Sequence, residues 1–146
     1  LSLKNEYENG SGLLPDCRLR YGLWFRSKDL RAEDVTERLR IEPDHVLEKE
    51  KLSGGVTDRR NAWLLRTELL PFEEQSQACK DFCSKFIACE REIIELLRMK
   101  ETDAELDLSL YTGRCSFDAL VLPRELTELA YRIGTEIYLG FYAVPR

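Results

Sequence analysis

The chain has 146 residues, of which 43% are hydrophobic and 34% charged, and its formal net charge is -5 at pH 7. This profile is typical of one globular domain that can bury a core, and the acidic balance disfavours a chain-wide phosphate-binding surface. No stretch approaches the roughly 18 apolar residues of a membrane span, and the polar first residues are unlike a secretory signal. A cytoplasmic protein is therefore expected.

The five cysteines and the single histidine narrow the possible chemistry. An odd number of cysteines without framework spacing is typical of reduced intracellular thiols rather than of a disulfide scaffold. Because His45 is the only histidine, one chain cannot build a His-based triad or a multi-histidine metal site. The sequence holds no diagnostic catalytic or cofactor motif, so we assign no catalytic residue, metal or cofactor, and an enzyme is the less favoured class.

The first elements follow from composition and hydrophobic periodicity. Residues 1–15 are polar and bear several Gly, Ser and Asn residues, which predicts a disordered or tag-like lead to a single domain over 16–146. Residues 17–25 alternate between apolar and polar side chains, as a half-buried strand does. A short amphipathic helix is expected within 27–41. The charged, glycine-bearing segment 45–61 indicates a loop or a frayed edge hairpin, and 62–67 a further strand.

The second half of the chain contains the longest predicted element, a single surface helix over 72–98. Its apolar stripe consists of Cys79, Phe82, Phe86, Cys89, Ile93 and Leu97. Residues 103–112 form the cleanest predicted strand, and 117–122 a possible short one. A third helix is expected to begin near Pro123 and to end at Gly134. Segment 136–143 is the last strand, and its predicted inward side chains are Ile137, Leu139, Phe141 and Ala143.

Strands with one apolar face and helices with one apolar stripe favour two layers. We therefore predict a two-layer α+β sandwich of ferredoxin-like character, in which helices cover one face of a mixed or antiparallel sheet. A doubly wound sheet is less favoured, because it requires strands that are buried on both faces, whereas these strands alternate.

Several short motifs resemble one bacterial protein family. They are Leu39-Arg40-Ile41-Glu42-Pro43, the basic glycine loop with Gly54, Gly55, Arg59 and Arg60, the strand-opening Trp63, and Leu122-Pro123-Arg124-Glu125-Leu126 through Leu129, Ala130 and Gly134 to Tyr142. Over residues 16–142 the chain resembles the domain of unknown function 4279. The resemblance implies a small bacterial cytosolic protein and maps no catalytic residue. Small acidic bacterial proteins of this sort are similar to toxin-neutralising immunity proteins.

The outward sheet face is the strongest candidate site. If the inward assignments hold, it carries arginines and aromatic residues: Arg18, Arg20, Trp24, Arg26, Tyr111, Tyr138 and Tyr142. Trp, Tyr and Arg are enriched at interface hot spots, and a solvated face does not ordinarily need so many of them. A partner protein, a second copy or a further segment of the same chain are the competing occupants. Nucleic-acid stacking is disfavoured by the net acidity.

An alternative polar site uses carboxylates on the same face. Glu105 and Asp107 are two residues apart on one strand, Glu136 lies near a neighbouring one, and His45 follows in a loop. Such a set could bind a small ligand or a divalent cation for a metal-assisted enzyme. A solvated sheet face commonly carries such residues without chemistry, and a lone loop histidine is usually solvated. The cysteines Cys79 and Cys89 are read as core thiols. We therefore predict a non-enzymatic protein-interaction module of the immunity type.

Overall fold

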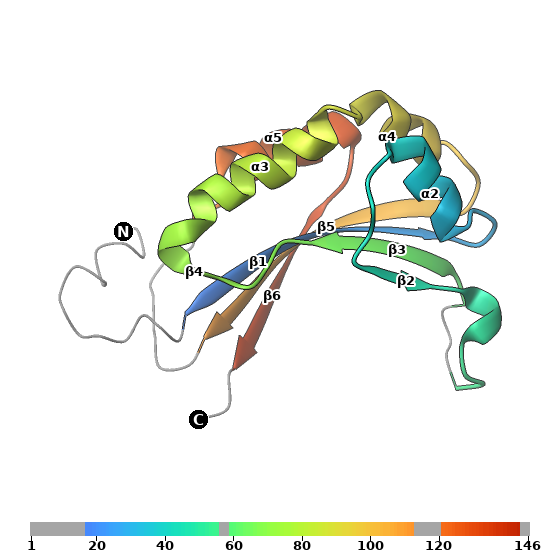
Figure 1. Cartoon of the computed structure of the whole chain (residues 1–146), viewed down its shortest axis with the longest axis horizontal. Helices are drawn as coiled ribbons and strands as arrows, with labels where there is room; N and C mark the ends of the chain where they lie inside the picture. The colour runs from blue at the N-terminus through green and yellow to red at the C-terminus, as the bar shows by residue number, and fades with distance from the viewer. Residues whose placement is uncertain (1–16, 56–58, 113–120, 144–146) are drawn as a thin grey trace.

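The computed structural model describes residues 17–55, 59–112 and 121–143 (Figure 1). The elements are β1 (Arg18–Ser27), α2 (Ala32–Leu39), β2 (His45–Leu47), β3 (Asn61–Arg66), β4 (Leu70–Pro71), α3 (Gln75–Ile87), α4 (Glu90–Leu97), β5 (Thr102–Thr112), α5 (Arg124–Ile133) and β6 (Ile137–Ala143). The predicted lead over 1–15 and most of the predicted strand over 117–122 lie outside the described residues. Residues 121 and 122, the described part of that predicted strand, do not form a strand.

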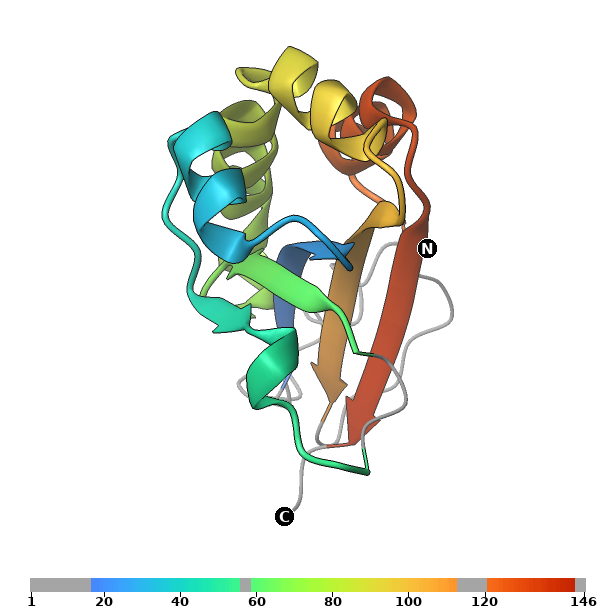
Figure 2. The same ribbon diagram turned by 90° about the vertical axis from the view of Figure 1, so that its right-hand side faces the viewer.

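The strands form one mixed sheet in the order β2-β3-β1-β5-β6, with the two-residue β4 paired to the start of β1. β1 runs antiparallel to both β3 and β5, whereas β5 and β6 are parallel and are connected through α5. The α-helices α2, α3, α4 and α5 lie on one side of the sheet (Figures 1 and 2). The predicted α+β sandwich with a mixed sheet is thereby confirmed, while its ferredoxin-like connectivity in particular is not.

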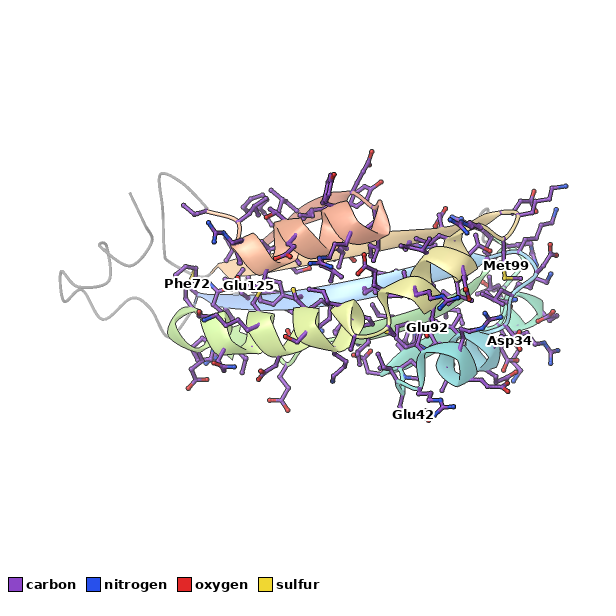
Figure 3. All side chains as sticks on the ribbon, turned by 90° about the horizontal axis from the view of Figure 1, so that it is seen from above. Asp34, Glu42, Phe72, Glu92, Met99 and Glu125 are labelled. Atoms are coloured by element: carbon purple, nitrogen blue, oxygen red, sulfur yellow. The ribbon has the colours of Figure 1, made fainter. Side chains whose placement is uncertain are left out.

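The core lies between the helices and the sheet. The inward side chains of β1 and of the residue before it are nearly inaccessible, as the alternation predicted: Cys17, Leu19, Tyr21, Leu23 and Phe25. An edge-to-face contact joins the sheet to α3, with 6.3 Å between the ring centroids of Trp63 and Phe86. Within α3, Phe86 makes a second edge-to-face contact with Phe82, at 5.0 Å. Seen from above, α3 and α5 lie side by side, and α2 and α4 cover the other end (Figure 3).

The prediction of a single helix over 72–98 is wrong. The chain forms a 3₁₀ turn over Phe72–Glu74 and then two helices, because Cys89, with φ -118° and ψ 28°, leaves the helical conformation between α3 and α4. The break allows α3 to pack on α5 while α4 contacts α2. Glu90 and Glu92 occupy the first turn of α4, where acidic side chains stabilise the exposed N–H groups.

The helix ends follow the expected backbone chemistry. Gly134 ends α5 with φ 71°, as predicted, and Pro123 occupies the N-cap of that helix. Arg40 ends α2 in the same left-handed region with φ 57°, which is unfavourable for a residue with a Cβ atom. None of the helices among the described residues combines the length and the apolar character that crossing a membrane requires.

Strand β6 differs from its predicted burial. Leu139 and Phe141 are in register with the buried Leu108 and Leu110, so they lie on the helix side of the sheet, as predicted. Yet 47% of the surface of Leu139 and 60% of that of Phe141 are exposed. They are exposed because β6 is the outermost strand on its side of the sheet. These two side chains therefore face the helix side of the sheet, as predicted, without being buried there.

Candidate functional site

We call the face of the sheet opposite the helices the open face. The strand register places alternate residues of β1, β5 and β6 on it in rows, such as Arg18, Tyr111 and Tyr142 across three strands. The predicted partner-binding residues share this face, namely Arg18, Arg20, Trp24, Arg26, Tyr111, Tyr138 and Tyr142. None of the described helices covers it (Figure 1).

One end of the open face carries an arginine–tyrosine stack made by Arg20, Tyr111 and Tyr142. The rings of Tyr111 and Tyr142 are stacked with centroids 4.9 Å apart and planes inclined by 19°. The guanidinium carbon of Arg20 lies 5.4 Å from the centroid of Tyr111, a cation–π contact. The Nε atom of Arg20 is buried without a hydrogen-bond partner among the described residues. The stack is thus held rigid by its own contacts, although one buried donor is left unsatisfied.

The other end carries a carboxylate cluster made by Glu105 and Asp107, with Trp24 and Arg26 beside it. The guanidinium carbon of Arg26 lies 4.9 Å from the Trp24 ring, and its Nη2 lies 3.5 Å from Glu105 Oε2. Burial, followed by the hydrogen bond and the negative charge of Glu105, raises the pKa of Asp107 from 3.8 to about 7. A hydrogen bond from Trp24 and the charge of Arg26 oppose this rise. Asp107 therefore gains and loses its proton near neutral pH.

Glu136 lies next to this cluster, just before β6. Its carbonyl oxygen accepts a hydrogen bond from the Leu106 N–H at 3.3 Å, and its carboxylate accepts one from the Tyr138 hydroxyl at 3.2 Å. That second bond raises the pKa of Tyr138 above its ordinary value. Tyr138 and Tyr142 are about half exposed, at 48% and 49%. Glu136 is accordingly brought to the same face as Glu105 and Asp107, as the sequence suggested.

His45 is not brought to the carboxylates. It begins β2 in register with Leu64, which is itself in register with Trp24. Three strand spacings, roughly 14 Å, therefore separate the backbone of His45 from that of Glu105. The imidazole is exposed at the opposite edge of the sheet from β6. The described geometry supports no shared role for His45 and Glu105.

The sequence reasoning missed several residues of this face. Leu64 and Ala62 are buried and in register with Trp24 and Arg26, yet they lie outside the helix-side core cluster. Arg66 pairs with Asp44 at 3.3 Å across the same face. The run Trp63-Leu64-Leu65 lacks alternation, which is the signal for a strand covered on both sides.

The cysteines of the described residues are buried, namely Cys17, Cys79, Cys83 and Cys89, and the last three are free thiols. The sulfur atoms of Cys79 and Cys83 lie 4.0 Å apart on α3. Their contact lowers the pKa of Cys79 and raises that of Cys83. Burial raises the pKa of Cys89 to about 11. These thiols have almost no accessible surface, in agreement with the core interpretation of Cys79 and Cys89. Among the described residues, no three His, Cys, Asp or Glu side chains are grouped to hold a metal ion.

Grooves bounded by described residues also occur outside the arginine–tyrosine stack and the carboxylate cluster. A groove of about 860 Å³ lies between α2 and α4, and its walls include Arg38 and Glu95, which pair at 3.0 Å. Smaller ones lie along α4 and beside Arg60. Their walls are charged, and ion pairs such as Arg91 with Glu95 at 3.5 Å join part of them.

The family can be named from the sequence profile that matches the chain. Residues 18–143, nearly the whole of it, match the model of the domain of unknown function DUF4279. The chain belongs to the DUF4279 family. The match covers every strand and helix given above, including the open face. No curated protein and no solved structure matches this DUF4279 chain.

Proposed function

We propose that this DUF4279 protein is a non-enzymatic interaction module whose open face binds a partner protein. The observation that carries the proposal is the arginine–tyrosine stack of Arg20, Tyr111 and Tyr142, which shares the open face with Trp24. Large aromatic and arginine side chains dominate binding energy at protein interfaces, because they bury much area at little entropic cost. Mutual stacking orders these side chains before a partner arrives, which lowers the cost of binding.

The charged side chains of the open face indicate which charges the partner carries. Arg18 and Arg20 have no ion-pair partner among the described residues, so this end suits an acidic group. The carboxylates of Glu105, Asp107 and Glu136 lie at the other end and suit a basic group. The net charge of -5 favours encounter with a basic protein. A basic toxin that the face occludes, as an immunity-type protein does, fits this description.

The candidate partners are the proteins encoded by the genes on either side of the gene for this protein, each purified for the measurement. Binding is measured by titration calorimetry for the wild type and for the double variant Trp24→Ala with Arg20→Ala. Truncating a hot spot costs about 2 kcal/mol, so we expect Kd to rise by about 30-fold or more. The matched control is Tyr131→Ala with Arg98→Ala, which removes an exposed aromatic on α5 and an exposed arginine at the C-cap of α4. Equal losses in both double variants, or no loss in either, would contradict the proposal.

A second candidate function is small-ligand or divalent-cation binding at the carboxylate cluster. It is favoured by the pKa of Asp107, about 7, because a carboxyl group that exchanges protons near neutral pH suits acid–base chemistry. Titration with Mg²⁺ or Ca²⁺, followed by the fluorescence of Trp24 beside the cluster, tests it against Asp107→Asn. A saturable signal that the variant lacks supports this candidate, and a flat titration argues against it.

A further inference from the structure

Strand β6 presents an apolar edge that no other described strand pairs with. Among the described residues it pairs with β5 alone and is the last strand of the sheet. Four of its large side chains are roughly half exposed, on both faces of the sheet: Tyr138 48%, Leu139 47%, Phe141 60% and Tyr142 49%. Natural sheets protect their edges with charges, proline, bulges or very short strands. The seven residues Ile137–Ala143 contain no charged residue and no proline, whereas the opposite edge strand, β2, has only three residues.

Half of the backbone N–H and C=O groups of β6 point away from β5, where another strand can pair with them. The Glu136 carbonyl accepts the Leu106 N–H, so residue 136 directs its backbone groups toward β5. Because successive residues of a strand alternate in this direction, residues 138, 140 and 142 do the same. Ile137, Leu139, Phe141 and Ala143 therefore direct their N–H and C=O groups away from the sheet. These four residues supply one complete edge for antiparallel pairing.

We propose that two copies of this chain join edge to edge through β6, antiparallel, with Gly140 opposite Gly140 of the second copy. The sequence Tyr138-Leu139-Gly140-Phe141-Tyr142 is nearly palindromic in side-chain class. Pairing about its centre places Tyr138 opposite Tyr142 of the second copy on the open face. On the helix face it places Leu139 opposite Phe141. This register also pairs all seven residues of the strand.

A second copy fits this edge because pairing about Gly140 creates no charge conflict. The seven residues that pair, Ile137–Ala143, carry no charge, so no like charges face each other across the two strands. A Cβ atom at Gly140 would lie 2.8 Å from the Tyr142 ring, so each ring lies over its own glycine and covers the Gly–Gly pair. Aromatic and aliphatic cross-strand pairs each stabilise a sheet. A two-fold axis closes the assembly at two chains and leaves no further β6 edge.

The mass of the full chain in solution tests this proposal independently of partner binding. Sedimentation equilibrium over roughly a hundredfold range of protein concentration should reveal a species of twice 17.0 kDa that dissociates on dilution. Phe141→Pro removes an N–H that points away from β5, so we expect a folded monomer. Leu139→Lys places a charge opposite Phe141 of the second copy and should also give a monomer. Tyr131→Ala, which removes an 88% exposed ring on α5, should leave the dimer intact.

These variants leave Arg20 and Trp24 of the open face unchanged, so failure here and failure of the proposed function are distinguishable. A wild type that is monomeric at every concentration would overturn the proposal. So would a dimer that persists in both Phe141→Pro and Leu139→Lys. Circular dichroism of each variant verifies the fold, and Leu139→Lys keeps the test decisive if the proline variant does not fold.

Cysteine cross-linking tests the register. Cys115, which is not among the buried cysteines described above, is first replaced by serine so that it cannot take part. Tyr138 and Tyr142 of the second copy form a non-hydrogen-bonded pair with Cα atoms about 4.5 Å apart, within disulfide reach. The double variant Tyr138→Cys with Tyr142→Cys should therefore cross-link under mild oxidation, and each single variant should not. Cross-linking of a single variant, or a double variant that stays uncross-linked while dimeric, would refute the Gly140-centred register.

Discussion

Replacing Asp107 by asparagine tests whether the carboxylate cluster on the open face holds a proton. The pKa of Asp107 is raised from 3.8 to about 7, first by burial and then by Glu105. A raised pKa means that the folded protein binds this proton more tightly than the unfolded chain does. Its stabilising effect is therefore fully present below about pH 4 and is lost as pH rises through about 7.

The magnitude follows from the size of the shift. A shift of roughly three pKa units corresponds to about 4 kcal/mol when no solvent screens the group. Asp107 is only partly buried, so screening reduces the effect to about 1–2 kcal/mol. Asparagine cannot ionise, yet its amide oxygen still accepts the Trp24 N–H. Asp107→Asn should thus be more stable relative to the wild type at about pH 8 than at about pH 4, by about 1–2 kcal/mol.

Urea unfolding at both pH values, followed by tryptophan fluorescence, measures this difference. Glu105→Gln is measured alongside, because it removes the charge of Glu105 and leaves Asp107 in place. Because burial is the larger cause of the raised pKa and Glu105 the smaller, the pH dependence should weaken in this variant without vanishing. A stability difference between wild type and Asp107→Asn that stays constant from about pH 4 to about pH 8 would refute the reasoning.

Three further variants test the packing by urea unfolding or spectroscopy. Phe86→Ala removes a fully buried ring that contacts Trp63 and should destabilise the protein by about 3–5 kcal/mol; a loss below about 1 kcal/mol would contradict the core assignment. Arg40→Gly relieves the φ of 57° at the end of α2 and should raise the free energy of unfolding by up to about 1 kcal/mol. Gly140→Ala places a methyl group 2.8 Å from the Tyr142 ring and should alter the near-ultraviolet circular dichroism, whereas an unchanged spectrum would argue against that ring position.

The sequence predicted the faces of β1 and β5 well, because each strand has one side in the core and one toward water. Alternation of period two is then visible, and it places Arg20, Trp24 and Asp107 together on one face. The same signal fails for β3, where Leu64 is buried on the side that carries Trp24. A strand covered on both sides does not alternate.

Other features depend on contacts between distant parts of the chain. The helical periodicity continues through Cys89, so it could not reveal that α3 and α4 separate there to pack on different neighbours. The contact of Arg20 with Tyr111 joins residues on β1 and β5, and depends on a register that no local pattern specifies. The raised pKa of Asp107 likewise requires a degree of burial that composition does not encode.

The central claim is that the open face is the partner-binding surface, and mapping of the interface by NMR tests it most directly. Backbone amide spectra of the labelled protein are recorded with and without a purified partner encoded by a flanking gene. We predict that shifts and broadening concentrate on Arg20, Trp24, Tyr111 and Tyr142. Perturbations confined to the groove between α2 and α4, with the open-face amides unchanged, would contradict the account.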